Sequence, residues 1–170
     1  MEFLNAIKEL IPDYAKDIRL NLDGVIARSS LEPEDALGVA LAAAFAAKSK
    51  PLVDAFKAAA SPATANASLT AAALMGMNNV WYPFVEMADD EDLKTQRAEL
   101  RMNAYATSGG VAKKQFEAYA LAASIVGKCH FCIASHYALL KKEGLTTQQL
   151  RDIGRIAAVV NAAAQVIAAS

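Results

Sequence analysis

The only two cysteines of the chain, Cys129 and Cys132, are separated by two residues, and both histidines lie beside them. His130 stands between the cysteines, and His136 follows Cys132 by four positions. A C-x-x-C pair in a chain without other cysteines indicates a redox-active dithiol. Residues four apart on a helix share one face, so His136 is expected one turn from Cys132. Thiol and base chemistry is therefore concentrated in one short segment.

Cys129 follows Gly127, where we expect one helix to break and the next to begin. A helix N-terminus carries about half a positive charge, which stabilises a thiolate and lowers a cysteine pKa from about 8.5 toward about 7. Cys132, one turn later, is close enough to form a disulfide with Cys129. His136 can accept a thiol proton near neutral pH.

Glu117 is the fourth candidate, on the helix before the break at Gly127. Its neighbours Phe116 and Tyr119 are aromatic, so we expect a desolvated carboxyl group with a raised pKa. Antiparallel packing of the two helices would let Glu117 orient His136, or take a proton from a cysteine through water.

Two other interpretations of the same residues remain open. Cys129, Cys132 and His136, with Glu117, are competent zinc ligands, so the chain could be a non-enzymatic zinc-binding or assembly module. Structural zinc sites usually draw on two separated ligand pairs, whereas three of these ligands share one helix. Alternatively, the cysteines could be unreactive core residues. His130 is expected to face solvent.

The composition predicts a helical, globular chain. Its 170 residues are 55% hydrophobic and 21% charged, which argues against disorder, and 38 alanines stand against 8 glycines and 5 prolines. The formal net charge of -1 gives no basic footprint for nucleic acid. No uninterrupted apolar run reaches the roughly 18 residues of a membrane span, and no signal peptide is visible. We therefore expect a cytoplasmic protein without nucleic-acid or membrane partners.

Apolar residues recur with helical spacing and strand-like alternation is absent, so the predicted fold class is all-α. The predicted helices cover residues 3–10, 14–26, 30–48, 51–60, 68–87, 112–126, 129–142 and 146 to the C-terminus. Residues 61–64 are expected to be a connector, and the acidic run 89–92 a solvated link that also caps a segment reaching Met102. Ser108–Gly110 is the clearest break, and Gly144 is expected to end its helix as a C-cap.

The two parts of the chain resemble each other at an offset of about eighty residues. Residues 41–60 align with residues 121–140, which places Ser49 at the position of Cys129 and Leu52 at that of Cys132. The pattern predicts a single domain over 1–170 built from a duplicated helical unit. Its first half would cover about 1–107 and its second, with the C-x-x-C site, about 111–170.

The chain resembles the alkyl hydroperoxide reductase D family, within the wider carboxymuconolactone decarboxylase-like superfamily. The similarity covers nearly the whole chain and includes residues 12–22, 75–80 and 100–103. Its most specific part is Glu117, eleven residues, then Cys129-x-x-Cys132-x-x-x-His136. One departure is Phe131, which stands where the family pattern has a second histidine before the second cysteine.

The resemblance implies an all-helical fold from a duplicated unit that assembles as a homotrimer, and a thiol-dependent peroxidase and disulfide reductase. It implies that the dithiol reduces an alkyl hydroperoxide reductase C-type peroxiredoxin. Dihydrolipoamide on a lipoyl-bearing acyltransferase would supply the electrons, with no bound cofactor. Glu117, Cys129, Cys132 and His136 match the family's catalytic positions. Phe131 leaves a two-histidine proton relay in doubt, because His130 lies on the other side of that position.

From these residues we expect a dithiol–disulfide cycle. Cys132, nearer to His136 and Glu117, would meet hydroperoxide and form a sulfenic acid, with which Cys129 condenses. Cys129, expected to be the more exposed thiol, would exchange with partner disulfides. The helix dipole alone would favour Cys129 as the nucleophile, so the residues leave both assignments open.

Overall fold

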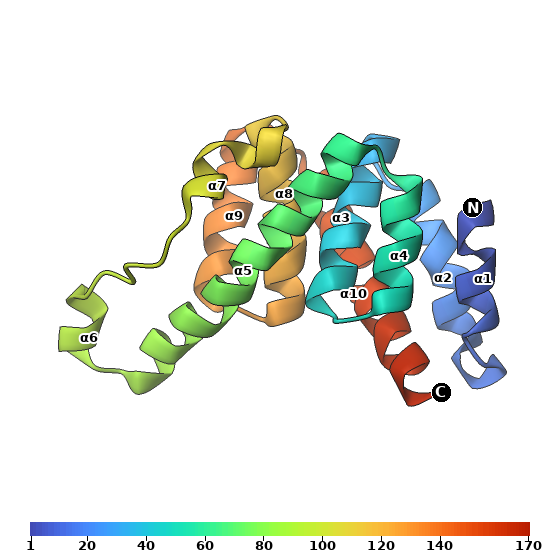
Figure 1. Cartoon of the computed structure of the whole chain (residues 1–170), viewed down its shortest axis with the longest axis horizontal. Helices are drawn as coiled ribbons and strands as arrows, with labels where there is room; N and C mark the ends of the chain where they lie inside the picture. Colours follow the sequence, from blue (N-terminus) through green and yellow to red (C-terminus); the bar gives the residue numbers. More distant parts are fainter.

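A computed structural model describes residues 1–170, and it contains helices only (Figure 1). This confirms the predicted all-α fold class. The α-helices are α1 Asn5–Glu9, α2 Lys16–Ala27, α3 Pro33–Ala46, α4 Lys50–Ala59, α5 Pro62–Ala88, α6 Glu91–Thr95, α7 Asn103–Ala106, α8 Lys113–Gly127, α9 His130–Lys142 and α10 Thr147–Ala169. Short 3-10 turns occupy η1 Glu2–Leu4, η2 Asp13–Ala15 and η3 Ser108–Gly110.

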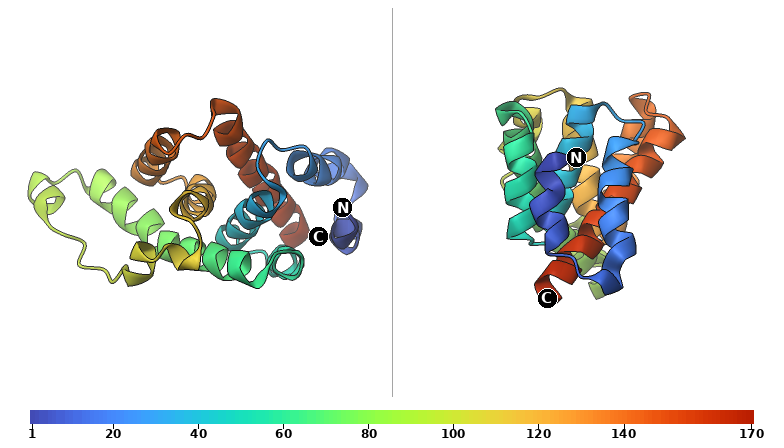
Figure 2. Two further views of the ribbon diagram at one scale, coloured as in Figure 1. Left: turned by 90° about the horizontal axis from the view of Figure 1, so that it is seen from above. Right: turned by 90° about the vertical axis from the view of Figure 1, so that its right-hand side faces the viewer.

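The centre of the fold is the group α3, α5 and α8, which pack against one another, and α3 and α8 also pack against α10. In α3 every residue from Ala36 to Ala44 is buried, which requires neighbours on all sides. Small side chains allow this close approach: the ring of Tyr119 on α8 fills the space where a Cβ at Gly38 would lie. Figure 2 shows both chain termini on the same side of the molecule.

The long helix α5 begins earlier than the sequence predicts. Residues 61–64 are not a connector: Ser61 is the N-cap, its hydroxyl accepts a hydrogen bond from Thr64 N at 3.2 Å, and Pro62 is the first helical residue. A serine followed by proline is a favoured helix start, because proline lacks only an N–H that would be unpaired there. The connector prediction is therefore wrong.

The segment after α5 is less helical than predicted. Asp89 has a left-handed backbone (φ 49°) that ends α5, and α6 is five residues long with no buried side chain. Residues 96–102 then run without helix and are mostly exposed, so the predicted segment reaching Met102 is wrong beyond Thr95. A short helix without a buried face has little to stabilise it. Figure 1 shows this stretch projecting beyond the rest of the fold.

Two turns separated by eighty residues have the same backbone geometry. Lys48 between α3 and α4, and Lys128 between α8 and α9, both have positive φ, at 59° and 55°. Ser49 N donates to Ala44 O at 3.1 Å, and Cys129 N donates to Ser124 O at 3.3 Å. The two turns lie at the offset of the predicted repeat, and the duplication and the division of the chain into two halves remain proposals.

The break before the C-x-x-C segment occurs at Lys128, not at Gly127. Gly127 is the last helical residue of α8, and the side-chain amide of Asn79 fills the space of its missing Cβ. The same amide donates to Ala123 O at 3.1 Å. Glycine is therefore needed here for close contact between α5 and α8 rather than for the turn.

α10 completes the core against α2, α3 and α8. By length and composition alone it is the one helix that could cross a membrane, and its apolar face, with Ile153, Ile156 and Val160, is buried in the fold. The carboxylate of Asp152 accepts hydrogen bonds from both N and Oγ of Ser30 at 2.8 Å, which anchors the α2–α3 connection to α10.

Candidate active site

The two cysteines lie at the N-terminus of α9, joined by a disulfide. Cys129 is the N-cap, and its sulfur accepts a hydrogen bond from Cys132 N at 3.3 Å. Cys129 is 0% exposed and Cys132 is 2% exposed, so the expectation that Cys129 is the more exposed sulfur is wrong. An N-cap side chain turns back over the first helical turn, and here it lies under α5, 3.8 Å from Asn78 O.

Glu117 and His136 meet in the core between α8 and α9. Nδ1 of His136 lies 2.6 Å from Oε2 of Glu117, and the carboxylate is only 1% exposed. The hydroxyl of Tyr105, on α7, donates a hydrogen bond to the other carboxylate oxygen, Oε1. The structure therefore brings together Glu117 and His136, as the sequence predicts, and adds a phenol to the pair.

The pKa of Glu117 is lowered, which contradicts the raised value expected from its aromatic neighbours. Burial alone pushes this pKa upward, as predicted. Hydrogen bonds from His136 and Tyr105, with the positive charges of His136 and Lys113, outweigh it and favour the ionised form. The sequence indicated the burial, but it could not indicate these distant partners. Glu117 is accordingly a carboxylate at neutral pH.

The second ring nitrogen of His136 also faces an acceptor. Nε2 lies 3.2 Å from the sulfur of Met75, on α5. A carboxylate and a thioether both accept hydrogen bonds, so an imidazolium with both N–H groups satisfies the two contacts at once. Each nitrogen of the His136 ring thus has an acceptor within hydrogen-bonding distance, which fixes the orientation of the ring beside the buried carboxylate.

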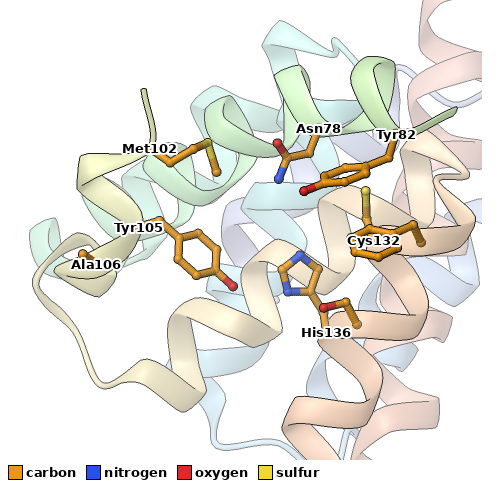
Figure 3. A pocket seen from close by; sticks show the side chains of 9 residues that line it. Asn78, Tyr82, Met102, Tyr105, Ala106, Cys132 and His136 are labelled. Carbon is orange, nitrogen blue, oxygen red and sulfur yellow. The ribbon is translucent and has the colours of Figure 1, made fainter. Parts of the chain in front are cut away.

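A cavity of about 350 Å³ lies beside Cys132 and His136 (Figure 3). Its wall consists of Asn78, Tyr82, Met102, Tyr105, Ala106, Phe131, Cys132, Ser135 and His136. Met102 and Tyr105 line one side and Tyr82 and Cys132 the other, with His136 between them. No aspartate, glutamate, lysine or arginine lines it, so the cavity suits an uncharged, largely apolar group that approaches the Cys132 sulfur.

His130 lies outside this cluster. Its side chain is 79% exposed, as expected, and its Nδ1 lies 3.0 Å from Glu86 Oε1 on α5. Phe131 stacks on Tyr82, with ring centroids 4.3 Å apart. The position that holds histidine in the family pattern is thus part of an aromatic wall. No group of three or more His, Cys, Asp or Glu side chains has an arrangement suited to a metal ion.

Sequence reasoning missed Tyr105 and Met75 as members of the site. Tyr105 lies in the exposed stretch between α6 and η3, and Met75 lies on α5 at a position with core-like spacing. Met75 belongs to the motif 75–80, which the family resemblance singled out without assigning it a role. No local pattern marks Tyr105, because its partner Glu117 comes from another helix.

The chain is similar to known proteins over nearly its whole length. The model of the Carboxymuconolactone decarboxylase family matches residues 91–170. A protein of Rhodospirillum centenum named alkyl hydroperoxide reductase AhpD is 44% identical, over 96% of this chain and 90% of its own. Proteins of the same name from Maricaulis maris and Coxiella burnetii are 43% and 39% identical, and the alignments cover 98% and 96% of each chain.

Proposed function

Because the chain belongs to the AhpD family of alkyl hydroperoxide reductases, we propose that it is a thiol-dependent peroxidase that reduces alkyl hydroperoxides. The observation that carries the proposal is the meeting of the Cys129–Cys132 disulfide with the buried pair Glu117–His136 at one apolar cavity. A redox-active dithiol beside a proton donor and acceptor is what peroxide reduction requires.

In the proposed cycle, the Cys132 thiolate attacks the outer oxygen of a hydroperoxide and breaks the O–O bond. Cys132 becomes a sulfenic acid, and the departing alkoxide takes a proton to become an alcohol. We assign the delivery of that proton to His136, which Glu117 holds. The Cys129 thiol then displaces hydroxide from the sulfenic sulfur, which leaves the disulfide and water. One dithiol and one hydroperoxide thus give one disulfide, one alcohol and one water.

Cys132 as the peroxide-reactive thiol is supported by its position. Cys132 lines the cavity, whereas Cys129 is fully buried and is not among the residues that line it. An imidazolium close to a thiol favours the thiolate, and the N–H groups of the first turn of α9 act in the same direction. Cys129 is placed to resolve the sulfenic acid, and once reduced its thiol has Asn78 O within 3.8 Å as an acceptor.

Dihydrolipoamide is the proposed electron donor, carried on a lipoyl-bearing acyltransferase. Its two thiols would reduce the disulfide by exchange and leave as the cyclic disulfide, so electrons balance without another reductant. The largely apolar wall of the cavity, which contains no Asp, Glu, Lys or Arg, is compatible with the apolar chain of such a donor. We also propose that the dithiol regenerates a partner peroxiredoxin of the alkyl hydroperoxide reductase C type.

We propose a cytoplasmic homotrimer. The C-terminal part of α5 and the stretch that follows it expose the large apolar side chains Val80, Phe84, Met87 and Leu100. Apolar side chains grouped on a projecting segment are suited to contact with other subunits. The trimer itself rests on the family resemblance, and the oligomeric mass in solution tests it.

The first experiment is hydroperoxide consumption driven by dihydrolipoamide, in wild type and Cys132→Ser, with free thiols counted before and after oxidation. The proposal predicts turnover that vanishes in the variant, and two thiols lost in wild type. A disulfide that forms readily without turnover would point to an obligate protein partner, and peroxiredoxin would then be added. Unreactive thiols with stoichiometric zinc would instead support the alternative of a zinc-binding module using Cys129, Cys132 and His136.

A further inference from the structure

The buried carboxylate of Glu117 has one hydrogen-bond partner on each oxygen. His136 occupies Oε2, and the hydroxyl of Tyr105 occupies Oε1. The two partners come from different parts of the chain: His136 belongs to the core helix α9, and Tyr105 to the four-residue helix α7 next to the projecting segment. The hydroxyl of Tyr105 therefore connects this part of the chain, through Glu117, to His136, the proposed proton donor.

We propose that Tyr105 is a positioning residue for peroxide reduction: its hydroxyl holds the Glu117 carboxylate in the orientation in which it bonds Nδ1 of His136, beside Cys132. The proposal rests on the proposed peroxidase function. Tyr105 acts on the reaction through Glu117 and His136. Its own ring forms part of the cavity wall.

The chemistry of the phenol suits this task. Burial first, and then the hydrogen bond to Glu117, raise the pKa of Tyr105, so the hydroxyl keeps its proton and always donates. Without this donor, Oε1 would be a buried carboxylate oxygen with no partner, which disfavours the charged form. A neutral Glu117 would hold the ring of His136 less firmly, because hydrogen bonds to an ionised acceptor are the stronger ones.

Tyr105 is held in place by packing that does not involve its hydroxyl. Its ring makes an edge contact with Phe116, with centroids 5.5 Å apart at 85°. Four residues later, Gly109 has φ of +59° and packs so closely on α5 that a Cβ would lie 2.9 Å from the Cα of Ala67. These contacts fix the backbone and ring, so removal of the hydroxyl should leave the ring where it is.

Few other charges act on Glu117. Lys113, on α8 itself, lowers its pKa from a distance, and α9 contributes His136. Among the remaining helices packed against α8, α5 brings the uncharged Met75 to His136. Neither α3 nor α10 contributes a group that acts on this pKa. The two thiols, once reduced, are the other titratable groups at the site. Loss of the Tyr105 hydroxyl should therefore change the pKa of Glu117 directly, with few other groups to compensate for it.

The test compares Tyr105→Phe with Tyr82→Phe, because both phenols line the cavity and only Tyr105 bonds to Glu117. Infrared titration of the reduced protein follows the protonated carboxyl band of Glu117, which Glu117→Gln identifies by its loss. We expect the titration midpoint in Tyr105→Phe to rise by about one pH unit, and kcat at pH 7 to fall roughly ten-fold with KM within two-fold. Tyr82→Phe should leave the midpoint unchanged.

The double variant Glu117→Gln/Tyr105→Phe tests whether Tyr105 positions Glu117 or only supports the fold. Once Glu117 is glutamine, Tyr105→Phe should change kcat by less than two-fold, because both act through one pair. An unmoved carboxyl midpoint in Tyr105→Phe, or a full ten-fold loss in the Glu117→Gln background, would overturn the proposal. The infrared titration needs no turnover. An inactive wild type would therefore reject the peroxidase function, while the carboxyl midpoint still decides whether Tyr105 controls Glu117.

Discussion

The sulfur of Met75 lies 3.2 Å from Nε2 of His136, a contact between α5 and α9 across sixty-one residues of sequence. Met75 is fully buried, and its thioether can only accept a hydrogen bond. Together with Glu117 on Nδ1, it gives each nitrogen of the ring an acceptor. The contact between Met75 and His136 therefore connects the motif 75–80 to the helix that carries the C-x-x-C segment.

Met75→Leu removes that acceptor while nearly conserving volume, so stability should change by less than about 1.5 kcal/mol. The contact is expected to contribute about 1 kcal/mol to holding the ring of His136, so kcat/KM should fall roughly five-fold. Steady-state kinetics and thermal unfolding together check this. Met87→Leu, at a side chain that is 78% exposed, is the matched control. Equal kinetics for the two variants would remove Met75 from the site.

Glu117→Gln should slow turnover by about 10²-fold, because an amide cannot hold an imidazolium as a carboxylate does. The lowered pKa of Glu117 means that the carboxylate persists as the pH falls through the usual glutamate range. Its contribution to both stability and rate should be present at neutral pH and lost only as the pH falls through that lowered pKa. Unchanged kinetics in the variant would exclude Glu117 from the mechanism.

Cys129→Ser should accumulate a sulfenic acid on Cys132 when it is treated with one equivalent of hydroperoxide, because the resolving thiol is gone. Cys132→Ser should accumulate none, since the Cys129 sulfur is buried away from the cavity. A sulfenic-acid trapping reagent followed by mass spectrometry distinguishes the variants. If only Cys132→Ser is trapped, the roles of the two cysteines are reversed.

Asp152→Asn should destabilise the fold by on the order of 3 kcal/mol, because the buried carboxylate holds Ser30 and faces both Arg151 and Arg155. Asp54→Asn, in the exposed pair with Lys50, should cost less than about 0.5 kcal/mol. Urea unfolding measures both.

The same carboxylate predicts a dependence on pH. Burial raises the pKa of Asp152, but hydrogen bonds from Ser30 and the two arginines outweigh it and lower the pKa from 3.8 to about 2. Its contribution to stability should be complete above pH 3.8 and decline as the pH falls toward 2. An Asp152→Asn variant with unchanged stability at pH 7 would contradict this account.

Gly38→Ala should destabilise the protein by about 2–3 kcal/mol, since the added Cβ occupies the space of the Tyr119 ring. Gly154→Ala is the control, because it also lies inside a helix and its Cβ meets nothing within 4 Å. There the gain in helix propensity should stabilise by up to about 1 kcal/mol. Thermal unfolding of both variants gives the comparison, and losses of similar size would contradict the packing argument.

Local chemistry explains which parts of the molecule could be predicted from its sequence. The sequence predicts the helices around Cys129 to within one residue at these ends, because Gly144 and Thr146 carry clear end signals. The start of α5 differs from the prediction because Ser61–Pro62, which resembles a connector in sequence, is an N-cap followed by the first helical residue. The lowered pKa of Glu117 depends on Tyr105 and His136, which only the tertiary fold brings to its two oxygens.

One wall of the cavity, formed by Met102, Tyr105 and Ala106, follows directly on the exposed stretch 96–101. That stretch has no buried side chain of its own, so a neighbouring subunit that packs against it in the proposed trimer would support the start of the wall at Met102. With the proposed trimer as that support, the specific activity becomes a function of protein concentration. Dilution below the dissociation constant of the assembly should loosen the cavity, and peroxide turnover should decline while the helical core remains folded.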